Sequence, residues 1–180
     1  MSHDLSAHTL LLYSDERTLF TELMKFISEG LQAEETVVVI AAEDHRAELR
    51  RRLLAQKIVD VSGRWEDRYC SFDAADTLAL YLVGGWPDER LFFTAMGHFL
   101  ESIPAPPPLR IYSEMVALLW NDQNYQAALH LEELWSTLAE QRQFTLICGY
   151  PTASLDTVDP SLVQHLHRIH SERSMRPGGR

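Results

Sequence analysis

Acidic and aromatic side chains follow the apolar runs that the sequence predicts to be β-strands. The residues at or just beyond the ends of these runs are Tyr13, Glu43, Glu114, Cys148 and Tyr150. Trp120 follows the fourth run closely enough to overhang the same edge. Ligands of open parallel sheets bind beyond the carboxyl ends of the strands, so we expect these residues to share one binding site. The group contains no lysine or arginine, which favours a small neutral or cationic organic ligand over an anion.

The turn after the first run argues against nucleotide hydrolysis. A phosphate-binding turn needs glycines for close backbone approach, a lysine for charge and a hydroxyl for magnesium. Residues 13–18 read YSDERT and contain neither glycine nor lysine. Asp15 and Glu16 instead place carboxylates at the helix N-terminus, where they stabilise the helix and repel phosphate. The sequence therefore predicts that ATP and GTP are neither bound tightly nor hydrolysed.

Three residues could take part in chemistry only in particular surroundings. Cys148 would be a nucleophile if a histidine approached it, but a cysteine in a buried strand is more often an inert small hydrophobe. Glu114 could accept a ligand's hydrogen bond or be a buried carboxylate tied to backbone amides or a histidine, and the sequence favours neither role. His8 lies at the opposite end of its run from Tyr13, about 16 Å away, so we expect a structural role for it.

A histidine-rich segment near the end of the chain raises the question of a metal site. Of His165, His167 and His170, only His167 and His170 would share a helical face, and no third ligand is in view. We therefore expect these histidines on a solvated helix surface, with no metal and no cofactor. The acidic pair of Glu132 and Glu133 is likewise expected to face solvent.

Five apolar or β-branched runs alternate with segments of helical period. The runs cover residues 8–13, 36–42, 69–72, 109–115 and 144–150. Apolar stripes in the intervening segments predict helices, and Asn121 or Asp122 is expected to cap the helix after the fourth run. Strand–helix alternation predicts right-handed crossovers and a parallel sheet. The expected fold is therefore a three-layer α/β domain, with a parallel sheet of about five strands and helices on both faces.

Length, charge and cysteine content limit the class of protein. A chain of 180 residues fits one domain, here residues 1–180, with a core over about 8–170 and a flexible tail over 171–180. The net charge of -10 argues against a general affinity for nucleic acid. The sequence shows no signal-peptide core and no apolar run long enough to cross a bilayer. Two cysteines in apolar runs form no disulfide framework, so we expect a cytoplasmic protein.

Several segments, in their order and spacing, resemble the MEDS sensory family, named for methanogen and methylotroph sensors of the DcmR type. The segments are HTLLLY at 8–13, TVVVIAAED at 36–44, IYSEMVALLW at 111–120 and FTLICGY at 144–150. The resemblance covers residues 8 to 169 and implies a RecA-like fold, distantly related to KaiC-type ATPases. Glu43 and Asp44 resemble the carboxylate pair that follows the second strand in those ATPases. The residues on the family's marked positions are His8, Tyr13, Glu114, Trp120, Cys148 and Tyr150.

The resemblance implies a sensory role, because MEDS domains are thought to bind small organic ligands and to accompany signalling proteins. The leading hypothesis is a non-catalytic regulatory domain that binds such a ligand and signals to a protein partner. A protein-interaction module without a ligand is the second hypothesis, and an enzyme that uses Cys148 or the carboxylates of Glu43 and Glu114 is the third. A homo-oligomer is compatible with each of them. A sensor needs a pocket of roughly 300 Å³ or more, whereas an interaction module needs an exposed apolar patch.

Overall fold

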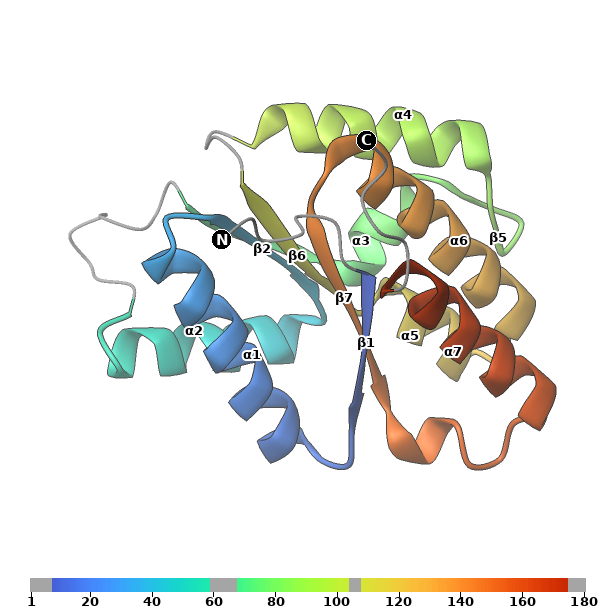
Figure 1. Cartoon of the computed structure of the whole chain (residues 1–180), viewed down its shortest axis with the longest axis horizontal. Coiled ribbons are helices and arrows are strands. Elements are labelled where there is room, and N and C mark those ends of the chain that lie inside the picture. The colour runs from blue at the N-terminus through green and yellow to red at the C-terminus, as the bar shows by residue number, and fades with distance from the viewer. Residues whose placement is uncertain (1–7, 59–67, 104–107, 175–180) are drawn as a thin grey trace.

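The computed structural model describes residues 8–58, 68–103 and 108–174 of the chain. Its centre is a sheet of five parallel strands in the order β1-β7-β6-β2-β3 (Figure 1). The strands are β1 (His8–Tyr13), β7 (Thr145–Pro151), β6 (Leu109–Ser113), β2 (Thr36–Ala41) and β3 (Tyr69–Asp73). The predicted parallel α/β fold is confirmed, and the carboxyl ends of all these strands lie at one edge of the sheet.

Helices cover both faces of the sheet, which makes three layers (Figure 1). One face carries α1 (Glu16–Gln32) and α2 (Glu43–Ala55). The helices of the other face are α3 (Ala74–Ala79), α4 (Glu89–Ser102), α5 (Met115–Asn121), α6 (Tyr125–Arg142) and α7 (Pro160–Ser174). None of the helices in the described residues is long and apolar enough to span a bilayer.

The inner strand β2 is apolar throughout because both of its faces are covered. Val37 and Val39 pack into the core beneath α1 and α2, while Val38 and Ile40 pack into the core on the opposite face. All of these side chains are fully buried. Alternate residues of a strand point to opposite faces, so a strand that is covered on both sides needs an unbroken run of β-branched residues.

Aspartates set the start of several helices. Asp15 caps α1 by accepting a hydrogen bond from the Thr18 backbone N–H at 2.8 Å. Asp73 and Asp88 cap α3 and α4 in the same way. A capping carboxylate satisfies a backbone donor that has no partner within the helix and suits the positive end of the helix dipole. The carboxylate that was expected to stabilise the first helix therefore does so.

The segment around the fourth strand differs from the prediction. The run 109–115 was expected to be one strand, but the strand stops short of Met115, which begins the short helix α5. Helix α6 then begins after Asn124, so the expected caps at Asn121 or Asp122 are wrong. A short apolar run can be a buried strand or a buried helix, and periodicity alone does not separate the two.

A small hairpin between α3 and α4 was not predicted either. Its strands are β4 (Leu82–Val83) and β5 (Trp86–Pro87), which pair antiparallel. Gly84 and Gly85 form the turn with positive φ angles of 59° and 82°. Glycine adopts this left-handed region without a steric penalty, which is why two glycines occupy the turn.

Candidate functional site

Four of the residues that the sequence singles out lie at the carboxyl edge of the sheet. Tyr13 and Tyr150 stand at the ends of the neighbouring strands β1 and β7. Glu114 directly follows β6, and Glu43 begins α2 on an exposed turn after β2. The side chains nevertheless divide between the two faces of the sheet. Tyr13 packs with the core beneath α1 and α2, whereas Tyr150 packs with the core on the side of α3 to α7.

Glu114 is a buried carboxylate that already has several hydrogen-bond donors. Its Oε2 accepts from the backbone N–H of Ala42 at 2.9 Å. Its Oε1 accepts from His45 Nδ1 at 2.7 Å and from the Tyr112 hydroxyl at 2.8 Å. The bond to Glu114 raises the pKa of His45, to which Asp44 also contributes. Of the two roles that the sequence leaves open, this geometry is that of the tied carboxylate, and it joins β6 to α2.

Trp120 and Tyr150 pack against each other instead of lining an open pocket. Their rings meet edge to face with centroids 5.5 Å apart, and the side chains are 1% and 0% exposed. Trp120 Nε1 donates to the backbone carbonyl of Ser154 at 3.0 Å. The Tyr150 hydroxyl donates to Glu132 at 2.7 Å. In this conformation neither ring is accessible to a ligand from solvent.

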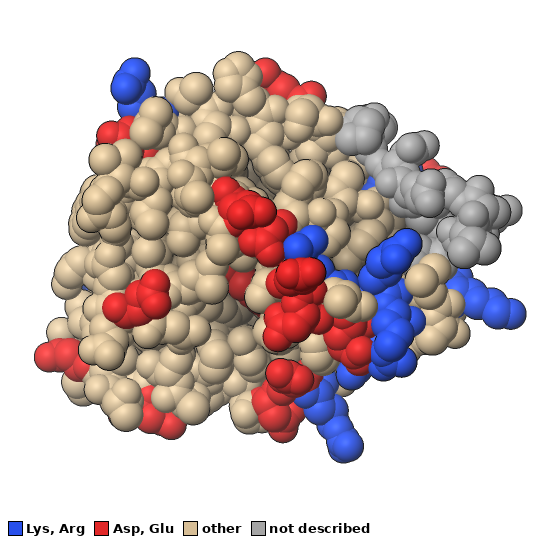
Figure 2. Space-filling model, turned by 180° about the vertical axis from the view of Figure 1, so that it is seen from behind, with Lys and Arg blue, Asp and Glu red and all other residues tan. Residues whose placement is uncertain are grey.

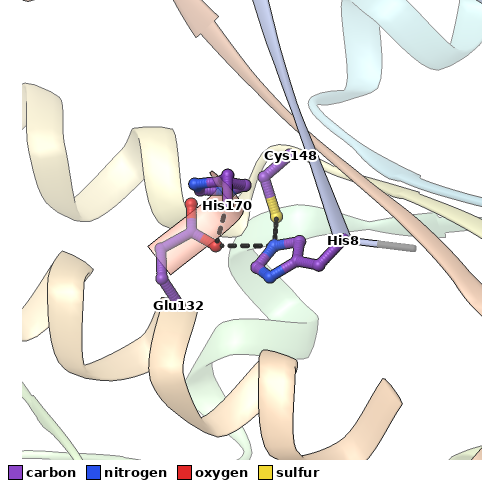
Figure 3. A group of neighbouring side chains, drawn as sticks. All are labelled: His8, Glu132, Cys148 and His170. Carbon is purple, nitrogen blue, oxygen red and sulfur yellow. Dashed lines mark hydrogen bonds and ion pairs between the residues drawn. The ribbon is translucent and has the colours of Figure 1, made fainter. Parts of the chain in front are cut away.

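A second group of polar side chains, the buried cluster, consists of His8, Glu132, Cys148 and His170 (Figure 3). It lies where β1, β7, α6 and α7 meet, and one donor atom of each residue lies within 4.8 Å of the others. His8 Nε2 is 3.0 Å from Glu132 Oε2 and 3.4 Å from Cys148 Sγ. His170 Nε2 is 3.6 Å from the same Glu132 oxygen. A histidine does approach Cys148, as nucleophilic chemistry would require.

Two expectations are corrected by this cluster. Glu132 was expected to face solvent, yet it is fully buried, and His170 is buried instead of lying on a solvated helix surface. Helix α6 packs against α4, α5 and α7, so its buried arc is much wider than one apolar stripe. The expectation holds for His165, which lies on the partly exposed side of α7.

Hydrogen bonds outside the cluster fix the orientation of its members. His8 Nδ1 pairs with the Ser136 hydroxyl at 2.5 Å. His170 Nδ1 donates to the Leu166 carbonyl at 2.7 Å, one helical turn earlier. Among the described residues, Glu132 Oε2 and His170 Nε2 are buried and form no well-aligned hydrogen bond, only the ion-pair contacts of 3.0 Å and 3.6 Å given above. Buried polar atoms without a hydrogen bond are rare in folded proteins and call for an explanation.

Burial and mutual charge control protonation in the cluster. Burial alone would raise the pKa of Glu132, but the adjacent His170 and His8 and the Tyr150 hydroxyl lower it to about 2. Burial lowers the pKa of His170. Burial, with the Glu132 charge beside it, raises the pKa of Cys148 well above its usual value. The thiol is therefore protonated and shielded from solvent, which does not suit a free nucleophile.

The molecule leaves a hollow open between α3 and α5. Its volume is about 330 Å³. It is lined by Ala75, Leu78, Ala79, Leu82, Leu118, Asn121 and Asp122. The walls are mostly apolar, with one amide and one carboxylate. No residue that the sequence predicted to bind ligand lines this hollow, although Glu114 and Trp120 lie at the two ends of the helix that forms one wall.

Exposed apolar side chains lie next to the hollow. Leu80, Val83 and Trp86 are 58%, 57% and 46% exposed. They belong to the end of α3 and to the β4–β5 hairpin, which also contributes Leu82 to the hollow. The Trp86 ring stacks on His130 of α6 at 5.0 Å, so the hairpin rests on the body of the domain. This arrangement leaves a small apolar surface in contact with water.

Acidic and basic side chains gather on one part of the face opposite to the view of Figure 1, and other acidic side chains on that face stand apart from basic ones (Figure 2). Figure 2 shows acidic and basic side chains next to one another there, while much of the same face carries no charge. On α2, Arg51 and Arg52 contact Glu48 at 2.7 Å and 2.6 Å. Arg46 contacts Asp73 at 3.1 Å. The arginines of α2 that form these pairs are matched by carboxylates and do not form an uncompensated basic surface.

Comparison with known proteins identifies a family for nearly the whole chain. Residues 7–171 match the family described as the methanogen/methylotroph, DcmR sensory domain, or MEDS. A search of curated proteins finds no match. The match begins just before His8 and ends just after His170, and so includes both ends of the buried cluster. The chain therefore belongs to the MEDS family of sensory domains.

Proposed function

We propose that this domain senses a small neutral or cationic organic molecule, which binds in the hollow between α3 and α5, and that it regulates a protein partner. The observation that carries the proposal is the hollow itself. Its volume of about 330 Å³ reaches the lower end of the range of ligand sites. Its apolar walls favour an organic molecule, and Asp122 at its margin favours a neutral or positively charged one.

Helix α5 contacts both the hollow and the core, so a movement of this helix would be transmitted from the hollow to the rest of the domain. Its outer side lines the hollow through Leu118, while its inner side carries Trp120 into the core. The helix begins after Glu114, which is bonded to His45 of α2. A ligand that shifts α5 would therefore strain the bonds of Glu114 and the packing of Trp120. In this proposal, Glu114, Trp120 and Tyr150 do not bind the ligand directly. Their hydrogen bonds and packing change when the ligand shifts α5.

The proposed readout surface is the exposed apolar group of Leu80, Val83 and Trp86. It adjoins the hollow through the β4–β5 hairpin, so ligand and partner would act on the same segment. The same surface favours the second candidate function, an interaction module that needs no ligand. A second copy of the chain is one such partner. We also propose a cytoplasmic location, because Cys70 and Cys148 form no disulfide bond.

We further propose that the domain is not an enzyme. Cys148 is the strongest nucleophile candidate, and burial raises its pKa and keeps water and substrate away from its sulfur. The carboxylates of Glu43 and Glu114 differ in their surroundings, since Glu43 is exposed and Glu114 is held by its donors. Nucleotide hydrolysis has no support at the start of α1, where the Asp15 side chain caps the helix.

A thermal-shift screen of small alcohols, amines and quaternary ammonium ions tests the ligand site. A ligand at 100 times its Kd stabilises a protein by about 2.7 kcal/mol, which is roughly 5 to 10 °C in Tm for a chain of this size. Ala79→Phe fills the hollow from the exposed side of α3 and should abolish the shift. Ala47→Phe, at an exposed position of α2, is the matched control and should keep it.

Two further variants separate the hollow from the site predicted at the strand ends. Trp120→Ala and Glu114→Gln should retain binding in the hollow, although both lower the starting Tm. Hits that survive Ala79→Phe but are lost in Trp120→Ala would place the ligand beside Tyr150 and contradict the hollow. An empty screen, together with a protein partner that is lost on Trp86→Ala, would favour the interaction module.

A further inference from the structure

We infer that the buried cluster of His8, Glu132, Cys148 and His170 binds one divalent transition-metal ion, with zinc as the best fit. The inference does not depend on the hollow between α3 and α5 or on the ligand proposed for it. It rests on the convergence of four donor atoms, on the lack of a well-aligned hydrogen bond at two of them, and on the hydrogen bonds that hold the side chains from outside.

The spacing of the donors is close to that of a tetrahedral zinc site. Zinc bonds of about 2.0–2.3 Å place neighbouring ligand atoms about 3.3–3.8 Å apart. In the cluster, His8 Nε2 lies 3.4 Å from Cys148 Sγ. Glu132 Oε2 lies 3.0 Å from His8 Nε2 and 3.6 Å from His170 Nε2. Small side-chain movements would therefore suffice to surround an ion (Figure 3).

Three of the four ligand side chains, all but Cys148, are held by their other polar atom. His8 uses Nδ1 for Ser136, and His170 uses Nδ1 for the Leu166 carbonyl, so both present Nε2 to the centre. Glu132 uses Oε1 for the Tyr150 hydroxyl and presents Oε2. This pattern of outer hydrogen bonds is the one that orients ligands in metal sites. A metal ion would also bind Glu132 Oε2 and His170 Nε2, which form no well-aligned hydrogen bond among the described residues.

The charges of the four donor side chains would balance the charge of a divalent ion. This balance is needed because the cluster is buried. The carboxylate of Glu132 and the thiolate that Cys148 becomes on binding carry two negative charges, and neutral His8 and His170 add none. The sum with a divalent ion is zero, which avoids an uncompensated charge in the core. Nitrogen, sulfur and a single carboxylate oxygen favour zinc over magnesium or calcium, which prefer sites made of oxygen.

The ion would stabilise the fold as a structural metal and would have no catalytic role. The protein supplies four ligands and leaves no position open for substrate, as in structural zinc sites. The ligands come from β1, α6, β7 and α7, so the ion would fasten the first strand and the last helix to the middle of the domain. Because the binding energy of a structural metal is also folding energy, its removal would weaken the attachment of β1 and α7 to the domain.

Metal content and cobalt substitution test the site in the whole chain. Purified protein analysed by inductively coupled plasma mass spectrometry should contain about one zinc per chain, and chelation should lower its Tm. Cobalt(II) added to the stripped protein should give tetrahedral visible bands and a near-ultraviolet thiolate-to-cobalt charge-transfer band. Cys148→Ser should lose the charge-transfer band. Cys70→Ser, which changes the other thiol, is the matched control and should keep it.

Ser136→Ala is a second test that does not depend on the folding of Cys148→Ser. It changes only the residue whose hydroxyl is hydrogen-bonded to His8 Nδ1. It should keep the charge-transfer band and weaken zinc binding about 10- to 100-fold in competition with a chromophoric chelator. Protein that stays folded by circular dichroism but binds neither zinc nor cobalt would overturn the inference. A charge-transfer band that persists in Cys148→Ser and disappears in Cys70→Ser would overturn it as well.

Discussion

Gly149 is the residue at which a single methyl group should disturb the centre of the domain most. It lies in β7 between Cys148 and Tyr150 and faces the ring of Tyr112. A Cβ at this position would come within 2.9 Å of Tyr112 Cε2 and 3.0 Å of Cζ, and closer still to the hydroxyl. Tyr112 cannot easily move away, because it is fully buried and its hydroxyl is bonded to Glu114 at 2.8 Å.

The expected magnitude for Gly149→Ala follows from these contacts. Overpacking of a core costs about 1–3 kcal/mol, and disturbing a buried hydrogen bond to a carboxylate adds about 1.5–3 kcal/mol. The lower backbone entropy of alanine in the unfolded chain offsets about 0.4–1 kcal/mol. We therefore expect the free energy of unfolding to fall by roughly 1.5–5.5 kcal/mol, measured by urea denaturation with circular dichroism.

Gly97→Ala is the matched control for this experiment. Gly97 lies inside helix α4, and a Cβ there would meet only the end of the Arg142 side chain, at 3.7 Å. Alanine in a helix interior should stabilise the domain by about 0.5–1 kcal/mol. In the double variant Tyr112→Phe with Gly149→Ala, the loss should be smaller than the sum of the single losses, because the nearest atom is gone. A Gly149→Ala variant as stable as the wild type, or strictly additive losses, would refute this reasoning.

Three further predictions concern pH, nucleotides and capping. Because the bond to Glu114 raises the folded-state pKa of His45 above its ordinary 6.5, its contribution to stability is complete below pH 6.5 and is lost as the pH rises through the folded-state value. The difference in urea stability between wild type and His45→Gln should therefore shrink from pH 6 to pH 9, and a constant difference would contradict it. Mg-ATP and Mg-GTP should give no micromolar binding in calorimetry, because Asp15 occupies the start of α1; measurable heats would contradict it. Asp88→Ala should lower the free energy of unfolding by about 1 kcal/mol through loss of the cap on Leu91, and an unchanged urea midpoint would contradict it.

Periodicity and β-branched runs were enough to predict the sheet, because the inner strands β2 and β7 are covered on both faces and are nearly continuous in apolar residues. They were not enough for the segment 109–121. There one apolar run passes from strand to helix at Glu114, where the backbone turns to helical angles. The β4–β5 hairpin was missed as well, since two-residue strands carry too short an alternation to be recognised.

The buried cluster shows why side-chain sites are harder to predict than elements. The sequence points to Cys148 and His8 separately, and it makes a nucleophilic role for Cys148 depend on a nearby histidine. Glu132 and His170 were assigned to solvent because polar residues on helices usually face water. The available signal was the i, i+4 spacing of Glu132 and Ser136 on a helix rich in alanine and leucine, which indicates burial on several sides. These residues form one site only because α7 packs against both β1 and α6.

The most direct test of the sensory account is an NMR titration of the isotope-labelled full chain with the strongest small organic hit from the thermal-shift screen. The account predicts saturable amide shifts that centre on α3 and α5, around Ala79, Leu118 and Asp122, and that extend to His45 through Glu114. The same titration of Ala79→Phe should leave these amides unchanged. Shifts confined to the surroundings of Tyr150, or equal shifts in Ala79→Phe, would contradict the account.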